Sequence, residues 1–129
     1  MNGESTPRGL RWALRLREAP GGDGVVIVEV GGRLGHASAG RLAATLGAVV
    51  DRGVRGLVLD LAQVDYISSA GLEAVDRAAM RLAGRDGVLV LCALSVPVRI
   101  AFDLAGFLTR YPVESSREQA IIRAGHPRA

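Results

Sequence analysis

The stretch LVLDLAQVDYISSAGL, from Leu57 to Leu72, decides the fold. Its first part, residues 57–61, is a nearly continuous apolar run, which is typical of a β-strand covered on both faces. A loop is predicted over 62–69. The helix after the loop is marked by apolar residues at helical spacing, namely Leu72, Val75, Ala79 and Leu82. A buried strand that leads through a loop into a helix is a unit of an α/β protein.

The residues upstream predict a hairpin and a first helix. Alternation of apolar and charged residues over 12–17 and a β-branched run over 25–30 predict two strands, with a turn at 20–24. Gly31 and Gly32 are expected to end the second strand. The helix that follows is predicted from Ala39 to Gly53, with its apolar side formed by Leu42, Ala43, Leu46, Val49 and Val50.

The residues downstream predict another buried strand over 88–91 and a helix that Ser95 caps, with Pro97 in its first turn. Gly106 is expected to stop this helix. Its apolar side is predicted to consist of Ile100, Leu104 and Phe107.

The last predicted unit is a short extended piece over 111–113 and a final helix. Ser115 and Glu118 have the spacing of a capping box at the start of this helix. Its small apolar face consists of Ala120, Ile121 and Ala124. The whole pattern predicts an α/β fold with an opening β-hairpin and a mostly parallel central sheet of about five strands, covered by about four helices.

The chain is expected to form one domain over residues 10–125, with disordered tails at 1–9 and 126–129. Its net charge of +3 comes from 16 arginines, which are dispersed, against 13 acids, and only 4% of the residues are aromatic. This composition argues against nucleic-acid binding. The apolar runs are too short for membrane insertion, and the polar N-terminus has no signal sequence, so a cytoplasmic protein is expected.

No enzyme site, metal site or cofactor site is predicted. Cys92 lies in an apolar run, where burial as a small hydrophobic residue is favoured. The serines at 68 and 69 lack the glycine that a nucleophile elbow needs before its serine, and the histidines, His36 and His126, offer a poor general base. No His, Cys and Asp cluster has the spacing of metal ligands.

The loop at Ser68 and Ser69 is the candidate functional site. It follows the carboxyl end of a predicted strand, where sites in open α/β sheets occur. One interpretation is that a serine simply caps the helix and that Gly71 allows close packing. The other is a phosphoacceptor, because a helix N-terminus favours a phosphate group. The local pattern leaves both interpretations open.

Several segments together resemble the STAS domain of bacterial anti-sigma factor antagonists and sulfate transporters. The similarity covers about residues 25–125. The matching segments are Gly32-Arg33-Leu34, Leu57-Val58-Leu59-Asp60-Leu61, Tyr66-Ile67-Ser68-Ser69-Ala70-Gly71-Leu72, Leu91-Cys92-Ala93-Leu94-Ser95 and Phe102-Asp103-Leu104-Ala105-Gly106-Phe107.

The resemblance implies a non-enzymatic protein that binds an anti-sigma factor with serine kinase activity. In the antagonists the loop reads Asp-Ser-[Ser/Thr]-Gly-Leu, and the serine after the aspartate is phosphorylated. This places the phosphoacceptor at Ser69, with Ser68 as the second choice. The implied partner-binding residues are Gly35, His36, Tyr66, Ile67, Ser68, Ser69, Ala70, Gly71 and Leu72.

Two departures from the antagonist pattern favour an alternative function. Ser68 replaces the aspartate, and Gly35 stands where the antagonists commonly carry an acidic residue. The alternative is an unphosphorylated STAS interaction module in a sensory or transport complex. The arginine face of the opening hairpin, with Arg11, Arg15 and Arg17, also leaves a homodimer open.

Overall fold

The computed structural model describes residues 14–126. The predicted tail at 1–9, the strand start at Trp12 and residues 127–129 lie outside this range. The described elements, in chain order, are β1 (Arg15–Gly22), β2 (Val25–Leu34), α1 (Ala39–Asp51), β3 (Gly56–Ile67), α2 (Ser69–Ala83), β4 (Val88–Cys92), α3 (Val96–Leu104), the 3₁₀ helix η1 (Phe107–Thr109), β5 (Val113–Glu114) and α4 (Arg117–Gly125).

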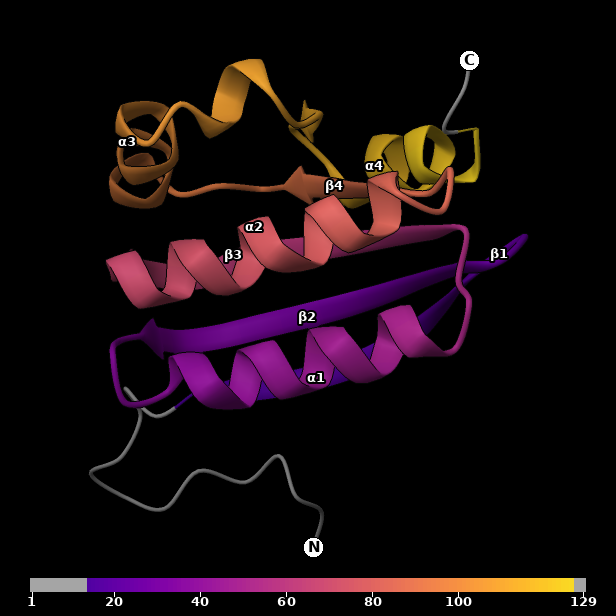
Figure 1. Cartoon of the computed structure of the whole chain (residues 1–129). Helices are drawn as coiled ribbons and strands as arrows, with labels where there is room; N and C mark the ends of the chain where they lie inside the picture. Colours follow the sequence, from indigo (N-terminus) through magenta and orange to yellow (C-terminus); the bar gives the residue numbers. More distant parts are fainter. Residues whose placement is uncertain (1–13, 127–129) are drawn as a thin grey trace, which may run out of the picture.

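The strands form one five-stranded sheet in the order β1-β2-β3-β4-β5. The hairpin strands β1 and β2 are antiparallel, whereas β2, β3, β4 and β5 run parallel to one another. Parallel neighbours need crossover connections, and α1, α2 and α3 lie in these connections (Figure 1). The predicted opening hairpin, mostly parallel sheet and covering helices are therefore confirmed.

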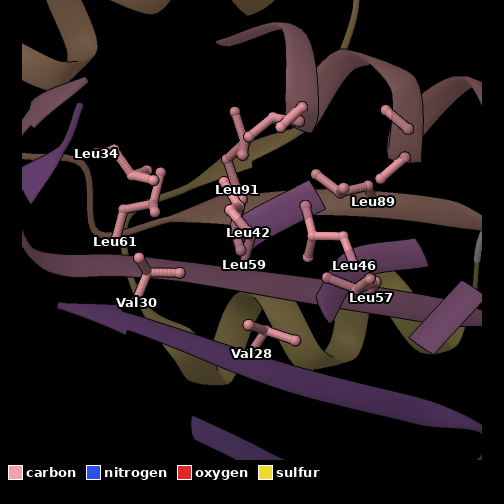
Figure 2. Packing of buried hydrophobic residues seen from close by; sticks show 14 of the residues in the cluster. Val28, Val30, Leu34, Leu42, Leu46, Leu57, Leu59, Leu61, Leu89 and Leu91 are labelled. Carbon is pink, nitrogen blue, oxygen red and sulfur yellow. The ribbon is translucent and has the colours of Figure 1, made fainter. Parts of the chain in front are cut away.

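The sheet has a hydrophobic cluster on each face. The larger one packs α1, α2 and α3 against the sheet, and Figure 2 shows leucines and valines of β2, β3, β4 and α1 meeting in it. The smaller one lies under α4 and includes Ala120 and Ala124 of that helix. Because β3 is covered on both faces, residues 57–61 are apolar at every position except Asp60.

β3 is longer than the sequence predicts and takes in most of the expected loop at 62–69. Its pairing with β2 shifts register twice: Glu29 pairs with Asp60 but Gly31 with Gln63, and Gly32 pairs with Val64 but Arg33 with Tyr66. Each shift leaves one extra residue on β3. From Leu61 to the end of β3, the buried residues are consequently Leu61, Val64 and Ile67. Their spacing of three differs from the two-residue alternation by which a strand is predicted. The prediction that Gly31 and Gly32 end the second strand is also wrong, because both glycines pair with β3 and β2 continues to Leu34.

The hairpin turn is also tighter than predicted, because β1 extends through Pro20 to Gly22. Its pairing with β2 shifts register between Pro20 and Gly22. Pro20 is tolerated there because β1 is an edge strand of the sheet. Only Asp23 and Gly24 remain as the turn, both with positive φ.

The predicted apolar side of α3 is wrong. Val98 and Phe102 are fully buried, whereas Ile100 is 53% exposed and Leu104 is 84% exposed. Phe107 is buried, but it belongs to η1, which follows a turn at Gly106 with φ of +81°. The turn changes the direction of the chain, so Phe107 does not share a helix face with Ile100 and Leu104.

The start of α4 is one residue later than the capping-box spacing predicts. Ser116, not Ser115, is the N-cap, and its hydroxyl accepts a hydrogen bond from the backbone N–H of Gln119 at 3.2 Å. The preceding strand is Val113–Glu114 rather than 111–113. Ala120 and Ala124 are buried as predicted, and Ile121 is half-buried.

Cys92 is buried at the end of β4, as the sequence predicts. Burial raises the pKa of its thiol to about 12, and the Asp60 carboxylate adds to the increase. At neutral pH the thiol is therefore protonated and shielded from solvent. Cys92 packs as a small hydrophobic residue.

Candidate functional site

The candidate site begins where β3 ends beside β2. Leu34 pairs with Ile67, and the backbone N–H of Ser68 donates to the Leu34 carbonyl at 2.8 Å. Gly35 and Ser68 each follow one of these paired residues. The two positions that depart from the antagonist pattern are therefore next to each other. Figure 1 shows this end of the sheet at the start of both α1 and α2.

Ser68 and Ser69 have different roles at the start of α2. Ser68 is the N-cap in an extended conformation, and its hydroxyl accepts a hydrogen bond from the Gly71 N–H at 3.2 Å. Ser69 is the first residue of the helix and is exposed. The Ser69 hydroxyl makes no hydrogen bond with another residue between 14 and 126. The Ser68 hydroxyl is thus used to cap α2, and the Ser69 residue is left exposed at the start of the helix.

The helix terminus at Ser69 favours a negative charge. α2 has 15 residues, and no acidic side chain lies in its first turn. Its unpaired N–H groups and the positive end of its dipole stabilise an anion there. A phosphate on Ser69 would meet no carboxylate within that turn.

Gly71 is buried and allows α2 to start close to the sheet. A Cβ atom at this position would lie 2.8 Å from Cγ1 of Ile67 and 3.4 Å from the Leu34 carbonyl oxygen. Ile67 is itself 7% exposed. Ile67 and Gly71 therefore shape the loop from inside, whereas Tyr66 and Ser69 are its exposed residues.

Tyr66 carries a contact that the sequence analysis missed. The Arg33 guanidinium lies 3.8 Å from the centroid of the Tyr66 ring, and Tyr66 remains 38% exposed. The pair forms because Arg33 and Tyr66 are register partners on β2 and β3. The Gly-Arg-Leu motif drew attention to Arg33 in the sequence. It does not predict the register shift that places Arg33 opposite Tyr66.

Gly35 and His36 lie in the turn that leads into α1. The Gly35 N–H donates to the Ser38 hydroxyl at 3.0 Å, and its carbonyl accepts from the N–H groups of Ser38 and Ala39. His36 is exposed. A Cβ atom at Gly35 would meet nothing within 4 Å, so the space beside this backbone position is open. Glycine at this position therefore lacks the acidic charge of the antagonist pattern, and no neighbouring atom excludes a Cβ atom there.

A second surface near the loop was also missed. Val96, Ile100 and Leu104 recur every four residues along α3 and are 73%, 53% and 84% exposed. The hydroxyl of Ser95, the residue before α3, donates to the Val64 carbonyl of β3 at 2.9 Å instead of capping the helix. α3 thus begins beside the end of β3, at the same end of the molecule as the start of α2 (Figure 1). We call Val96, Ile100 and Leu104 the α3 stripe.

Within residues 14–126, no group of three or more His, Cys, Asp or Glu side chains is placed to hold a metal ion. In the same range, no helix is long and apolar enough to cross a membrane.

The comparisons with known proteins agree with this fold. The model of the STAS domain family matches residues 17–120, so the chain belongs to that family. The candidate anti-sigma factor antagonist BtrV of Bordetella bronchiseptica is 48% identical over 98 residues, which cover 76% of this chain and 84% of BtrV.

Solved structures share the fold. An anti-sigma factor antagonist from Mycobacterium paratuberculosis superposes with a TM-score of 0.80 at 24% identity, over 93% of this chain and 97% of its own. The phosphorylated form of the Bacillus cell fate determinant SpoIIAA superposes with a TM-score of 0.66 at 20% identity, over 86% of this chain and 98% of its own.

The cap assignment gives a prediction about stability. Ser68→Ala is expected to destabilise the protein by about 1 kcal/mol because the Gly71 N–H loses its partner. Ser68→Asp should restore most of this loss, since aspartate caps as well as serine. Ser69→Ala is expected to stay within about 0.5 kcal/mol of the wild type. Urea denaturation of the three variants measures these differences, and a Ser69→Ala loss as large as that of Ser68→Ala would contradict the assignment.

Proposed function

We propose that the protein is an anti-sigma factor antagonist that binds an anti-sigma factor with serine kinase activity through the loop at 66–72. The supporting observation is the difference between the two serines: Ser68 caps α2, while the Ser69 hydroxyl is exposed and unbonded at the helix N-terminus. Ser69 is the phosphoacceptor in this proposal. The similarity to BtrV supports the same class of function.

The switch follows from charge. Phosphorylation adds about −1.5 to −2 charge at pH 7 to a surface that is neutral at Ser68, Ser69 and Gly35. The phosphate is tolerated by the helix terminus, so the fold of the antagonist is preserved. The partner, which fits the neutral loop, instead meets a bulky anion and is released. This function involves no catalysis by the protein itself, and it places the protein in the cytoplasm with its partner.

The α3 stripe is proposed to enlarge the contact surface. Three large apolar side chains exposed on one helix face are costly in water unless a partner covers them. Their helix begins beside the end of β3, where the Ser95 to Val64 hydrogen bond holds it. A partner that contacts Tyr66 and Leu72 at the loop would reach Val96 at the start of α3.

The experiment uses the histidine-kinase-like ATPase encoded nearest to this gene. The full-length protein is incubated with this kinase and ATP, and its intact mass is measured. A gain of one phosphate is expected in the wild type and in Ser68→Ala, and none in Ser69→Ala. Ser69→Asp is expected to weaken complex formation in pull-downs by at least about tenfold, while Ser69→Ala binds normally. Phosphate on Ser68 alone would overturn the choice of acceptor.

A second candidate function is an unswitched interaction module in a sensory or transport complex. It is favoured by the adjacent neutral positions Ser68 and Gly35, where the antagonists carry acidic residues. Equal partner binding by Ser69→Ala, Ser69→Asp and wild type would support it. The variant Gly35→Asp/Ser68→Asp is the decisive comparison, because the space beside the Gly35 backbone is open. Phosphorylation of this variant but not of the wild type would show that the missing acids abolish the switch.

The homodimer expected through the hairpin face stays a prediction. Arg15 and Arg17 lie on β1, the edge strand of the sheet, and Arg11 lies outside the described residues. Charged side chains on an edge strand also protect it against unwanted pairing.

A further inference from the structure

A hollow of about 420 Å³ opens at the β5 edge of the sheet, where no residue of the 66–72 loop lines it. Its walls come from Arg99 of α3, the segment 108–113 and Arg123 of α4. Three of these lining residues are arginines, Arg99, Arg110 and Arg123, and none of the lining residues is acidic. The helices α3 and α4 and the segment between them therefore each contribute one arginine to the wall of the hollow.

Two of the arginines are held by neighbouring side chains, of which Asp76, Glu114 and Phe107 do not line the hollow and Tyr111 does. Arg110 pairs with the Asp76 carboxylate at 3.5 Å, and its guanidinium lies 5.0 Å and 5.1 Å from the ring centroids of Phe107 and Tyr111. Arg123 pairs with Glu114 at 3.2 Å. The carboxylates and rings thus hold the guanidinium groups in place and leave the hollow open.

Arg99 supplies a charge that has no counter-ion. It forms no ion pair with any residue between 14 and 126. Asp76 and Glu114 balance two of the three guanidinium groups, so one positive charge remains. Each guanidinium has five N–H donors, and the ion pairs of Arg110 and Arg123 use only part of them. The hollow therefore offers both a net positive charge and unused donors.

Donors and charge of this kind suit a phosphate group. The planar fork of arginine matches the oxygen atoms of a phosphate, and bidentate hydrogen bonds to it are charge-assisted. An anion in the hollow would also balance the charge of Arg99, which Asp76 and Glu114 leave uncompensated. The geometry points to a binding site for a small phosphate-bearing molecule, with Arg99, Arg110 and Arg123 as its ligands. This site is separate from the proposed phosphoacceptor.

Inorganic pyrophosphate is the probe for the test. Amide and arginine side-chain NMR spectra of the ¹⁵N-labelled full-length protein are recorded during titration, and sodium chloride at matched ionic strength is the reference. Saturable shifts are expected for residues 108–113 and for the side chains of Arg99, Arg110 and Arg123. Arg99→Gln is expected to weaken the apparent affinity by about tenfold, since it removes a charge-assisted donor pair.

Arg77→Gln is the matched control, because Arg77 is exposed on α2 and does not line the hollow. It is expected to leave the titration unchanged. Arg99 is exposed and unpaired, so its replacement does not endanger the fold. The inference is overturned if chloride produces the same shifts, if the shifts do not saturate, or if Arg77→Gln weakens binding as much as Arg99→Gln.

Discussion

Replacing Phe102 by alanine is expected to lower the free energy of unfolding by about 3 to 5 kcal/mol. Its ring is fully buried in the larger core and meets the Phe107 ring edge-to-face, with centroids 5.3 Å apart. Removal of the ring loses this contact and leaves a cavity between α3 and the sheet. Urea denaturation monitored by circular dichroism measures the loss, with an unchanged m-value as the sign that the unfolding transition is the same.

The matched controls are Ile100→Ala and Leu104→Ala on the exposed side of the same helix. Each is expected to change stability by less than about 0.5 kcal/mol because neither side chain is in the core. If the α3 stripe is a contact surface, both substitutions weaken partner binding. A loss of stability at Ile100 equal to that at Phe102 would mean that the helix is rotated relative to this structure.

Arg117→Leu is expected to destabilise the protein by about 2 to 4 kcal/mol. Glu29 and Asp60 are register partners on β2 and β3, so two carboxylates lie side by side on one face of the sheet. Asp60 is 9% exposed. Arg117 joins them: its Nε donates to Asp60 at 2.9 Å, and a second nitrogen donates to Glu29. The bond to Glu29 raises the pKa of Arg117, so the group stays charged.

The loss arises because Arg117→Leu leaves the buried Asp60 carboxylate without its ion-pair partner. The adjacent Glu29 carboxylate keeps only its pair with Arg17, at 4.0 Å. Arg117→Lys keeps the positive charge but lacks the planar guanidinium that donates to both carboxylates. An intermediate loss of about 1 kcal/mol in the free energy of unfolding is expected. Arg123→Leu is the control on the same helix, since its pair with Glu114 is exposed and contributes less than about 1 kcal/mol. Thermal and urea denaturation give the three values, and equal losses at Arg117 and Arg123 would contradict the role of burial.

The fold of this protein is readable from local patterns because its central strands are covered on both faces. Residues 88–91 are a continuous apolar run, residues 57–61 are one except at Asp60, and the helices α1 and α2 show helical spacing of apolar residues. Strands that alternate with helices permit few arrangements besides a parallel sheet. The ordered set of motifs then suffices for the STAS family, which the match over 17–120 confirms.

The candidate site is only partly readable. The motif at 66–72 indicates where the loop lies, but it does not tell which serine caps α2. That assignment depends on the extended conformation of Ser68 and its distance to the Gly71 N–H. Neither property follows from the order of two identical residues.

The sequence by itself determined the class of fold, the order of its elements and the start of a helix at the two serines, because these depend on periodicity and on motifs within a few residues. Tertiary structure alone decided the register shifts of β3, the Arg33 to Tyr66 contact, the buried side of α3 and the hollow that Arg99, Arg110 and Arg123 line. These features join residues that are far apart in the chain. Packing between elements selects among several faces and registers that the local pattern permits equally well.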